Sequence, residues 1–194
     1  MACKTLNNLQ SSKYHVHFDS KVCKDPKSRV KQINAISAQK ITNIVDVESK
    51  NSDALQRFEK TLKNMKDAEK LGKPIKFDLA YSNFSFELWL LLHKIDCNQS
   101  LSCIDNYLGL INKTFNREFE SLRQFKRKEN CENVMEQLSI DDVKNAVIRA
   151  KKLQFKKSED GLIPKKYGKY SYFCDNPATS VWVIVDEILK TCGV

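Results

Sequence analysis

The alternation of apolar and polar residues predicts the first elements of the chain. Residues 14–18 (YHVHF) alternate in this way and predict a short strand. A helix is expected to begin at Asp25-Pro26, because the fixed φ of proline suits the first helical turn. Residues near helical spacing give this helix an apolar stripe, formed by Val30, Ile33 and Ile36.

Strands and helices continue to alternate after this helix. The β-branched run 41–47 (ITNIVDV) has the profile of a strand buried on both faces, as in a parallel sheet. The next helix can be capped by Ser52 and stopped by Gly72 with Pro74. Its apolar face consists of Leu55, Phe58, Leu62 and Met65. A strand over 75–81 then leads into a helix over about 84–93, and this order predicts an α/β fold with a mostly parallel sheet flanked by helices.

From Leu101 onward the pattern is helical. Ser139-x-x-Asp142 is typical of a helix start, and the inward face of that helix would carry Ile140, Val143, Val147 and Ala150. Residues 156–169 predict a mobile, basic, glycine-containing loop, and Asn176-Pro177 predicts the start of a last helix. We expect an α/β core over 1–95 and a helical region over 96–194 that packs on it as one compact domain.

Composition narrows the class of protein. Apolar residues make up 41% and charged residues 29% of the 194 residues, a balance typical of a globular domain. No run of 18 apolar residues and no signal-peptide pattern occurs, so we expect a cytoplasmic protein. The seven cysteines are odd in number and form no C-x-x-C pair, which favours reduced thiols over disulfides or a zinc site. They are Cys3, Cys23, Cys97, Cys103, Cys131, Cys174 and Cys192.

The net charge of +9 is unevenly distributed. Between Lys144 and Lys169 there are nine Lys or Arg residues against only Glu159 and Asp160. Such an excess suits a nucleic-acid backbone, although a solvated surface that keeps the protein soluble explains the charge equally well. The residues expected to bind nucleic acid in this basic segment are Lys144, Arg149, Lys151, Lys152, Lys156 and Lys157.

The first candidate chemical group is Asp46-Val47-Glu48. Residues two apart in a strand point to the same side, so both carboxylates are expected to project from the strand's carboxyl end, where open parallel sheets bind ligands. Two such acids can bind Mg²⁺ or Mn²⁺, and a metal placed there can activate water or stabilise charge on a phosphate. The plainer interpretation is that both acids belong to a loop that caps the next helix.

The second candidate is the segment 81–93 (YSNFSFELWLLLH). Most of it serves the core, but Glu87 is an acid just inside the start of an apolar helix, where the helix dipole stabilises its charge. Such a carboxylate is either buried with a partner or lines a site. His93 could reach a cleft at the end of this helix, although a lone histidine there is more often a hydrogen-bonded structural group.

Three motifs together resemble the RloB family of bacterial defence proteins. The stretch AYSNFSFELWLLLH (80–93) is similar to that family's "AYSNP-x-FE-x-WLL-x-H" signature. The preceding IVDVES (44–49) lies where the family has an Asp-x-Asp strand, and NPATSV (176–181) resembles its "NP-x-T-x-V" element. The resemblance covers the chain from about Tyr14 to the C-terminus.

The resemblance implies a Toprim-like core, Mg²⁺- or Mn²⁺-dependent phosphodiester chemistry and a place in phage defence or abortive infection, often beside an ATPase that acts as sensor. By position, Asp46 and Glu48 would hold the metal and Glu87 would join them in catalysis. Ser82, Asn83 and His93 would lie near the nucleic acid, and Asn176 and Thr179 would support the site. No membrane partner is implied, and a homo-oligomer is compatible with the family.

The sequence departs from the family pattern in ways that bear on activity. Toprim proteins use a further Glu on an earlier strand, yet residues 1–12 contain no acid and Asp19 is too close to Asp46, so we expect this strand to be missing or atypical. Phe84 replaces the family's proline, and Glu48 replaces an aspartate. Two hypotheses therefore stand: a nuclease or nuclease subunit, and a non-catalytic partner of a defence ATPase. Convergence of Asp46, Glu48 and Glu87 would favour the first. A nucleotide-binding domain unrelated to cleavage is disfavoured, because no glycine-rich phosphate loop follows a strand.

Overall fold

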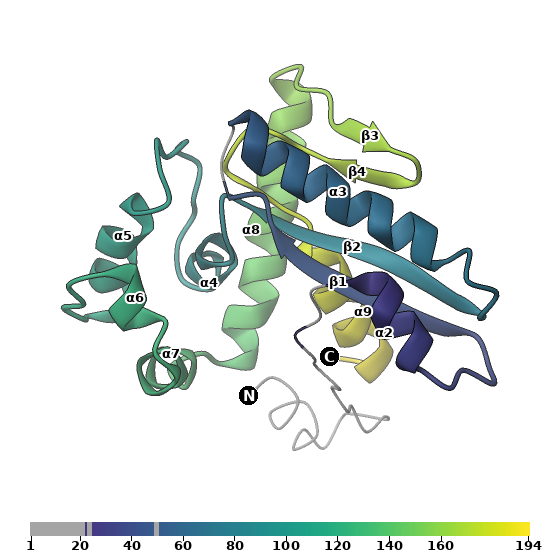
Figure 1. The fold of residues 1–194 in the computed structure, drawn as a ribbon. Coiled ribbons are helices and arrows are strands. Elements are labelled where there is room, and N and C mark those ends of the chain that lie inside the picture. The colour runs from purple at the N-terminus through teal and green to yellow at the C-terminus, as the bar shows by residue number, and fades with distance from the viewer. Residues whose placement is uncertain (1–21, 23–24, 49–50) are drawn as a thin grey trace.

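A small mixed sheet forms the centre of the fold in the computed structural model, which describes residues 22, 25–48 and 51–194. Strand β1 (Gln39–Asp46) pairs in parallel with β2 (Ile75–Asn83), and β5 (Ala178–Thr179) pairs antiparallel with the end of β2. In the described part of the chain the strand order is β1-β2-β5 (Figure 1). The α/β class is therefore confirmed, and the expected mostly parallel sheet is reduced to one parallel pair.

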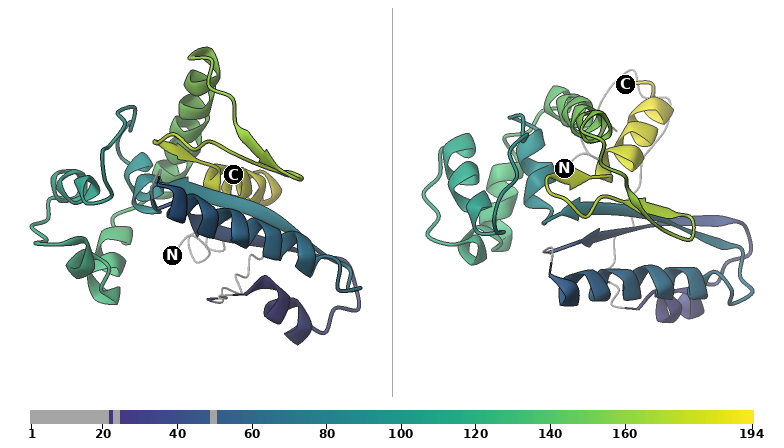
Figure 2. Two further views of the ribbon diagram at one scale, coloured as in Figure 1. Left: turned by 45° about the horizontal axis from the view of Figure 1, so that its top comes forward. Right: turned by 90° about the horizontal axis from the view of Figure 1, so that it is seen from above.

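Helix α3 (Ser52–Ala68) connects the two parallel strands and covers one face of the sheet, with α2 (Pro26–Gln32) beside it (Figure 2). Its predicted stripe is buried through Phe58, Leu62 and Met65, which pack with Phe77 of β2. The N-cap is Asn51, whose side chain accepts a hydrogen bond from the backbone N–H of Ala54 at 2.8 Å.

The opposite face of the sheet carries α4 (Glu87–Leu92), α8 (Ile140–Glu159) and α9 (Val181–Cys192) (Figure 2). Ser139 and Asp142 form a capping box at the start of α8, which confirms the helix start predicted there. Apolar residues of these helices form a second core with Ala80 of β2.

A helical lobe made of α5 (Asn106–Phe115), α6 (Leu122–Phe125) and α7 (Lys128–Met135) lies beside α4 (Figure 1). Apolar residues of the lobe belong to the same cluster as α4. All six residues of α4 are buried, so the helix is covered on more than one side, and the lobe provides part of that cover. The packing of this lobe places Lys126, at the end of α6, beside Glu87 at the start of α4.

Residues 156–169 do not form the loop that composition predicts. Lys165–Tyr167 (β3) and Tyr170–Tyr172 (β4) pair antiparallel as a hairpin, and Gly168 has a φ of +60° in the turn. Alternation of tyrosine with polar residues suits a strand with one buried face, and the high lysine content obscured this pattern.

Other boundaries also differ from the expectation. Helix α2 ends at Gln32, which leaves Ile36 93% exposed rather than in an apolar stripe. Strand β1 is not buried on both faces, because Ile44, on the face away from α3, is 55% exposed. Asn176-Pro177 leads into β5 instead of starting α9, and α4 begins at Glu87 instead of Phe84. The strand predicted over 14–18 lies outside the described residues.

No helix in the described part of the chain is both long and apolar enough to cross a membrane. The five described cysteines are free thiols.

The packing of α3 on the sheet predicts the effect of truncating its central leucine. Leu62→Ala is expected to lower the free energy of unfolding by about 2–5 kcal/mol, because the fully buried side chain would leave a cavity. Lys63→Ala, at the exposed neighbouring position, is the control and should change it by less than about 0.5 kcal/mol. Chemical denaturation measures both, and equal losses would contradict the assigned burial of this face.

Candidate carboxylate site

The candidate site lies where the two parallel strands end together. Asp46 is the last residue of β1 and is the register partner of Ser82 in β2. Asn43 contacts Met65 of α3, so the alternating residues Thr42, Ile44 and Asp46 face the other side of the sheet. This is the side on which α4 begins, and Glu87 is its first residue.

Backbone hydrogen bonds fix the end of β1 against the segment that leads into α4. The N–H of Val47 donates to the carbonyl oxygen of Ser82 at 3.0 Å, and the N–H of Glu48 donates to that of Phe84 at 2.8 Å. The carboxylates of Asp46 and Glu87 are thereby held near each other from two separate elements. We refer to them as the carboxylate pair.

The electrostatics of Asp46 reflect this proximity. Asp46 is exposed as a residue at the sheet edge, yet protein atoms surround enough of its carboxyl group that burial is the largest cause raising its pKa to about 6. The negative charge of Glu87 raises the pKa further, whereas Lys126 and the backbone N–H of Phe86 oppose the rise. A cation bound nearby would stabilise the ionised form of Asp46.

Glu87 is 4% exposed and has only one of its oxygens paired. The ammonium of Lys126, at the end of α6, lies 2.9 Å from Oε1, while Oε2 is buried without a hydrogen-bond partner. Lys126 is half-exposed but Glu87 is buried, so Lys126 can leave Glu87 at modest cost only where another cation takes its place.

Unpaired buried polar atoms are concentrated in the segment that leads from β2 to Glu87. Among the described residues six buried side-chain atoms lack a partner, and four of them belong to residues 83–87 and Tyr107. The Tyr107 hydroxyl approaches the backbone of Phe84 outside hydrogen-bonding geometry. Burial raises the pKa of this phenol above its ordinary range, and the charges of Glu87 and Asp46 add to the rise. Because buried polar groups are nearly always satisfied, such a cluster indicates a place for a ligand, ion or water.

Glu48 departs from the expected geometry. Strand β1 ends at Asp46, and Glu48 has a φ of +65°. The rule that residues two apart in a strand point to the same side therefore does not apply to Glu48. Its carboxylate is 60% exposed and forms an ion pair with Arg57 at 2.8 Å. No group of three His, Cys, Asp or Glu side chains within the described residues could hold a metal ion.

The carboxylate pair nevertheless fits a hard divalent cation. Mg²⁺ is often held by one or two carboxylates, with waters and substrate phosphates completing its shell. The unpaired Oε2 of Glu87 and the crowded carboxyl group of Asp46 supply the oxygen ligands that this ion prefers. Asp46 and Glu87 are thus the residues that could hold it, and Glu48 could join only by leaving Arg57.

The predicted rim residues are buried polar residues with partners inside the fold. Ser82 and Thr179 share a hydrogen bond of 3.1 Å that joins β2 to β5, and the amide nitrogen of Asn83 donates to the carbonyl oxygen of Cys174 at 2.7 Å. The side-chain oxygen of Asn176 accepts a hydrogen bond from the N–H of Leu101 at 2.9 Å. These contacts give all four residues a positioning role, and direct contact with nucleic acid stays a prediction for Ser82 and Asn83.

His93 is also buried at the end of α4. Its Nδ1 lies 2.9 Å from the carbonyl oxygen of Trp89, which can only accept, so that nitrogen carries the proton. Burial lowers the pKa of His93, which favours the neutral ring at physiological pH. These contacts fit the plainer interpretation, in which His93 is a hydrogen-bonded structural residue.

The basic segment is partly used inside the fold. Arg149 donates to the carbonyl oxygens of Leu92 and His93 at 2.8 and 2.9 Å. Lys151 pairs with Asp186 at 3.0 Å, and Lys157 is buried against the ring of Phe173. Among the described contacts, no ion pair or hydrogen bond uses the side chains of Lys144, Lys152 and Lys156, so these three of the predicted set are open for a partner.

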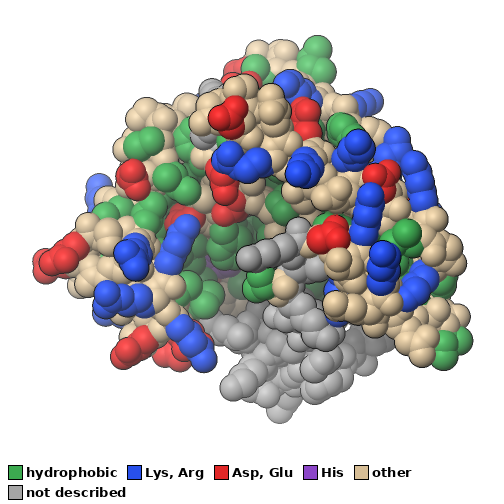
Figure 3. All heavy atoms as spheres, in the orientation of Figure 1, with side chains coloured by type: hydrophobic (Ala, Val, Ile, Leu, Met, Phe, Trp, Pro, Cys, Tyr) green, Lys and Arg blue, Asp and Glu red, His purple; other side chains and the backbone are tan. Residues whose placement is uncertain are grey.

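Two basic features escaped the sequence analysis. Figure 3 shows Lys and Arg side chains over α3 and the hairpin, and α3 itself contributes Lys60, Lys63 and Lys66. Lys126, which pairs with Glu87, lies in another element, and no local pattern connects the two residues. The only local signal for Lys126 is its position in the basic run RQFKRK (123–128).

Comparison with protein families gives a match over nearly the whole chain. Residues 2–188 match the family described as RloB-like protein. No curated protein and no solved structure matches the chain.

The raised pKa of Asp46 predicts a pH-dependent gain in stability for Asp46→Asn. The folded-state pKa of about 6 exceeds the ordinary 3.8, so ionisation of Asp46 destabilises the fold as the pH rises through this window. The shift in pKa corresponds to about 3 kcal/mol in the free energy of unfolding, and solvent screening at this exposed residue reduces it to about 1 kcal/mol. Removing the charge should therefore raise the melting temperature by about 2–4 °C. Thermal unfolding at pH 8 should show this rise, and at pH 4 it should nearly vanish.

Glu118→Gln, which also removes one carboxylate at an exposed position outside the helices, is the control and should give no such difference. A gain for Asp46→Asn of the same size at both pH values would show that ionisation is not its cause.

Proposed function

This chain belongs to the RloB-like protein family, and from that premise we propose that it is a divalent-metal-dependent nuclease, or the nuclease subunit of a larger assembly. The observation that carries the proposal is the carboxylate pair at the carboxyl ends of two parallel strands. Asp46 has a pKa raised to about 6 beside Glu87, whose Oε2 is buried and unpaired. Open α/β sheets bind their ligands at this edge.

The chemistry follows from the groups present. A bound Mg²⁺ or Mn²⁺ would act as a Lewis acid on a phosphate and favour a water nucleophile. Asp46 and Glu87 would hold and orient that ion, and the raised pKa of Asp46 would return toward its ordinary range on binding. Lys126 would move from Oε1 of Glu87 toward a phosphate oxygen of the substrate, because its half-exposed side chain is free to reorient.

Nucleic acid is the proposed substrate class because the chain has a net charge of +9 and an open basic face. Lys152 and Lys156 lie on the exposed side of α8 with Phe155, whose side chain is 65% exposed between them. Basic side chains bind phosphates, and an exposed aromatic ring can stack on a base. We further propose that the core is Toprim-like and that the protein acts in phage defence with an ATPase as sensor, as the family resemblance implies.

A second candidate function is a non-catalytic partner of a defence ATPase. The observation that favours it is the ion pair between Glu48 and Arg57, together with the lack of a three-residue metal group among the described side chains. In this case the carboxylate pair would serve only to bind Lys126 and fix the helical lobe. Metal binding separates the two functions.

Titration with Mn²⁺ tests the proposal directly. Calorimetry on the wild-type chain is expected to show saturable binding, and Asp46→Asn and Glu87→Gln should each weaken it at least about tenfold, since each removes one anionic ligand. Glu118→Gln, at an exposed position on the helical lobe, should leave it unchanged. No binding to the wild type would reject the metal site and favour the non-catalytic function.

Charge reversal on α8 tests the nucleic-acid surface. Lys152→Glu with Lys156→Glu should weaken binding of a labelled RNA or DNA strand and lower the slope of log K against log salt by about 2, because each phosphate contact contributes about 0.9. The control is Lys31→Glu with Lys76→Glu, which makes the same charge change at two exposed positions away from α8. Equal effects of the two pairs would show that only net charge matters.

A further inference from the structure

We propose that helix α3 and the β3–β4 hairpin together form a surface that binds the phosphate backbone of a double-stranded nucleic acid. This α3–hairpin surface is defined by Lys60, Lys63, Lys66 and Lys165, none of which has an acidic partner among the described residues. The proposal rests on the proposed function for its ligand class, nucleic acid. It requires neither the basic residues of α8 nor a metal at the carboxylate pair.

Three of these lysines form a row along α3. Lys60, Lys63 and Lys66 are all exposed and lie three residues apart, whereas the buried stripe of the helix faces the sheet. Residues at this spacing are neighbours on a helix surface, with Cβ atoms about 5–6 Å apart. The row therefore covers about 9 Å of the helix and can contact more than one phosphate of the same backbone.

The hairpin is fixed against α3 and extends the same surface. The hydroxyl of Tyr172 donates to the carboxylate of Glu59 at 2.7 Å. The Lys66 side chain lies beside the hairpin turn, where a Cβ on Gly168 would be 3.9 Å from its Nζ. Lys165 is the register partner of Tyr172, so both side chains are on the side of the hairpin that faces α3. Two segments far apart in sequence thus form one basic surface (Figure 3).

The acids of this region do not cancel the charge of the lysine row. Residues 52–70 and 165–172 together contain eight basic residues and four acids. Glu69 pairs with Lys169, Asp67 pairs with Lys27 at 3.2 Å, and Glu59 accepts the tyrosine hydroxyl described above. Because these acids are engaged elsewhere, the lysine row carries a positive potential that favours a polyanion.

The chemistry of the surface favours a duplex over an unpaired strand. Among the described residues, no exposed large apolar side chain lies on α3 or on the hairpin, so a base or an apolar protein surface finds no partner there. Lysines bind phosphates as point charges, and a DNA duplex carries one negative charge per about 1.7 Å of its axis, twice the density of one strand. On α8, by contrast, Phe155 is 65% exposed and can stack on an unpaired base.

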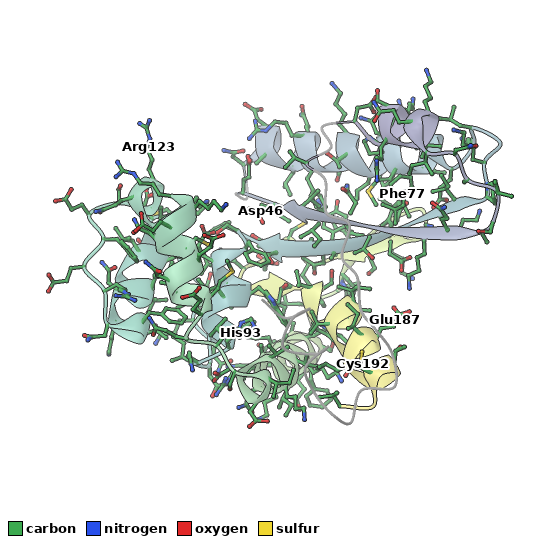
Figure 4. All side chains as sticks on the ribbon, turned by 90° about the horizontal axis from the view of Figure 1, so that it is seen from below. Asp46, Phe77, His93, Arg123, Glu187 and Cys192 are labelled. Carbon is green, nitrogen blue, oxygen red and sulfur yellow. The ribbon has the colours of Figure 1, made fainter. Side chains whose placement is uncertain are left out.

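The α3–hairpin surface and the basic residues of α8 lie on opposite sides of the molecule. Figure 4 shows Phe77 on the side of the sheet that α3 covers and Glu187, on α9, on the other side. Helix α8 shares that second side with α9 (Figure 2). A short strand bound to α8 therefore leaves the lysine row of α3 open, and the two surfaces can be tested separately.

Fluorescence anisotropy with labelled nucleic acids tests the proposal on the full chain without divalent metal. The probes are DNA and RNA duplexes of about 20 base pairs and a single strand of the same length. Lys63→Gln with Lys66→Gln should weaken duplex binding at least about tenfold at about 0.1 M salt and lower the slope of log K against log salt by about 2. Single-strand affinity should change less than about twofold. Whichever duplex the wild type binds more tightly identifies the ligand as DNA or RNA.

Lys113→Gln with Arg117→Gln removes the same charge from exposed positions on the helical lobe and should change duplex affinity less than about twofold. Lys152→Glu with Lys156→Glu should retain duplex binding, so a failure of the α8 surface or of the metal site leaves this result unaffected. The proposal would be overturned by absence of saturable binding to both duplexes. Equal losses from the two glutamine pairs, or equal losses for duplex and single strand, would overturn it as well.

Discussion

The parallel pairing of β1 with β2 is the interaction on which the rest of the structure depends. Eight register pairs run from Gln39–Ile75 to Asp46–Ser82 and make both strands end at one edge. The chain then continues from β2 directly into α4, so Glu87 arrives beside Asp46 without any long loop. A shift of one residue in this register would turn Asp46 toward α3 and away from Glu87.

Each face of this narrow sheet is covered by a different part of the chain. Helix α3 covers one face locally, while α8 and α9 return from the C-terminal half to cover the other and β5 adds a strand to the edge of β2. The polar residues of β2 and β5 are consequently buried between segments far apart in sequence. Their hydrogen bonds, such as the one between Ser82 and Thr179, hold the edge of the sheet that presents the carboxylate pair.

Local signals in the sequence predicted much of the fold. The start of α2 at Pro26, the capping box of α8 and the apolar face of α3 depend on neighbouring residues, so pattern alone sufficed. The pairing of Lys126 with Glu87 depends on how the helical lobe packs, and no local pattern contains that information. Glu48 illustrates the opposite error: the spacing from Asp46 was read as strand geometry, but the strand had already ended.

The same reasoning explains why charge counting along the chain overstated the binding surface on α8. A helix that packs on one side turns about half of its residues inward, and long basic side chains can be used there when carbonyl oxygens or acids are available. Arg149 caps the end of α4 and Lys151 joins α9, so their charges stabilise the fold on which the carboxylate pair depends. Lys152 and Lys156 point outward from the same helix, and the exposed ring of Phe155 lies with them. A surface that binds nucleic acid is therefore narrower than the basic segment, and it is defined by the direction in which the helix faces.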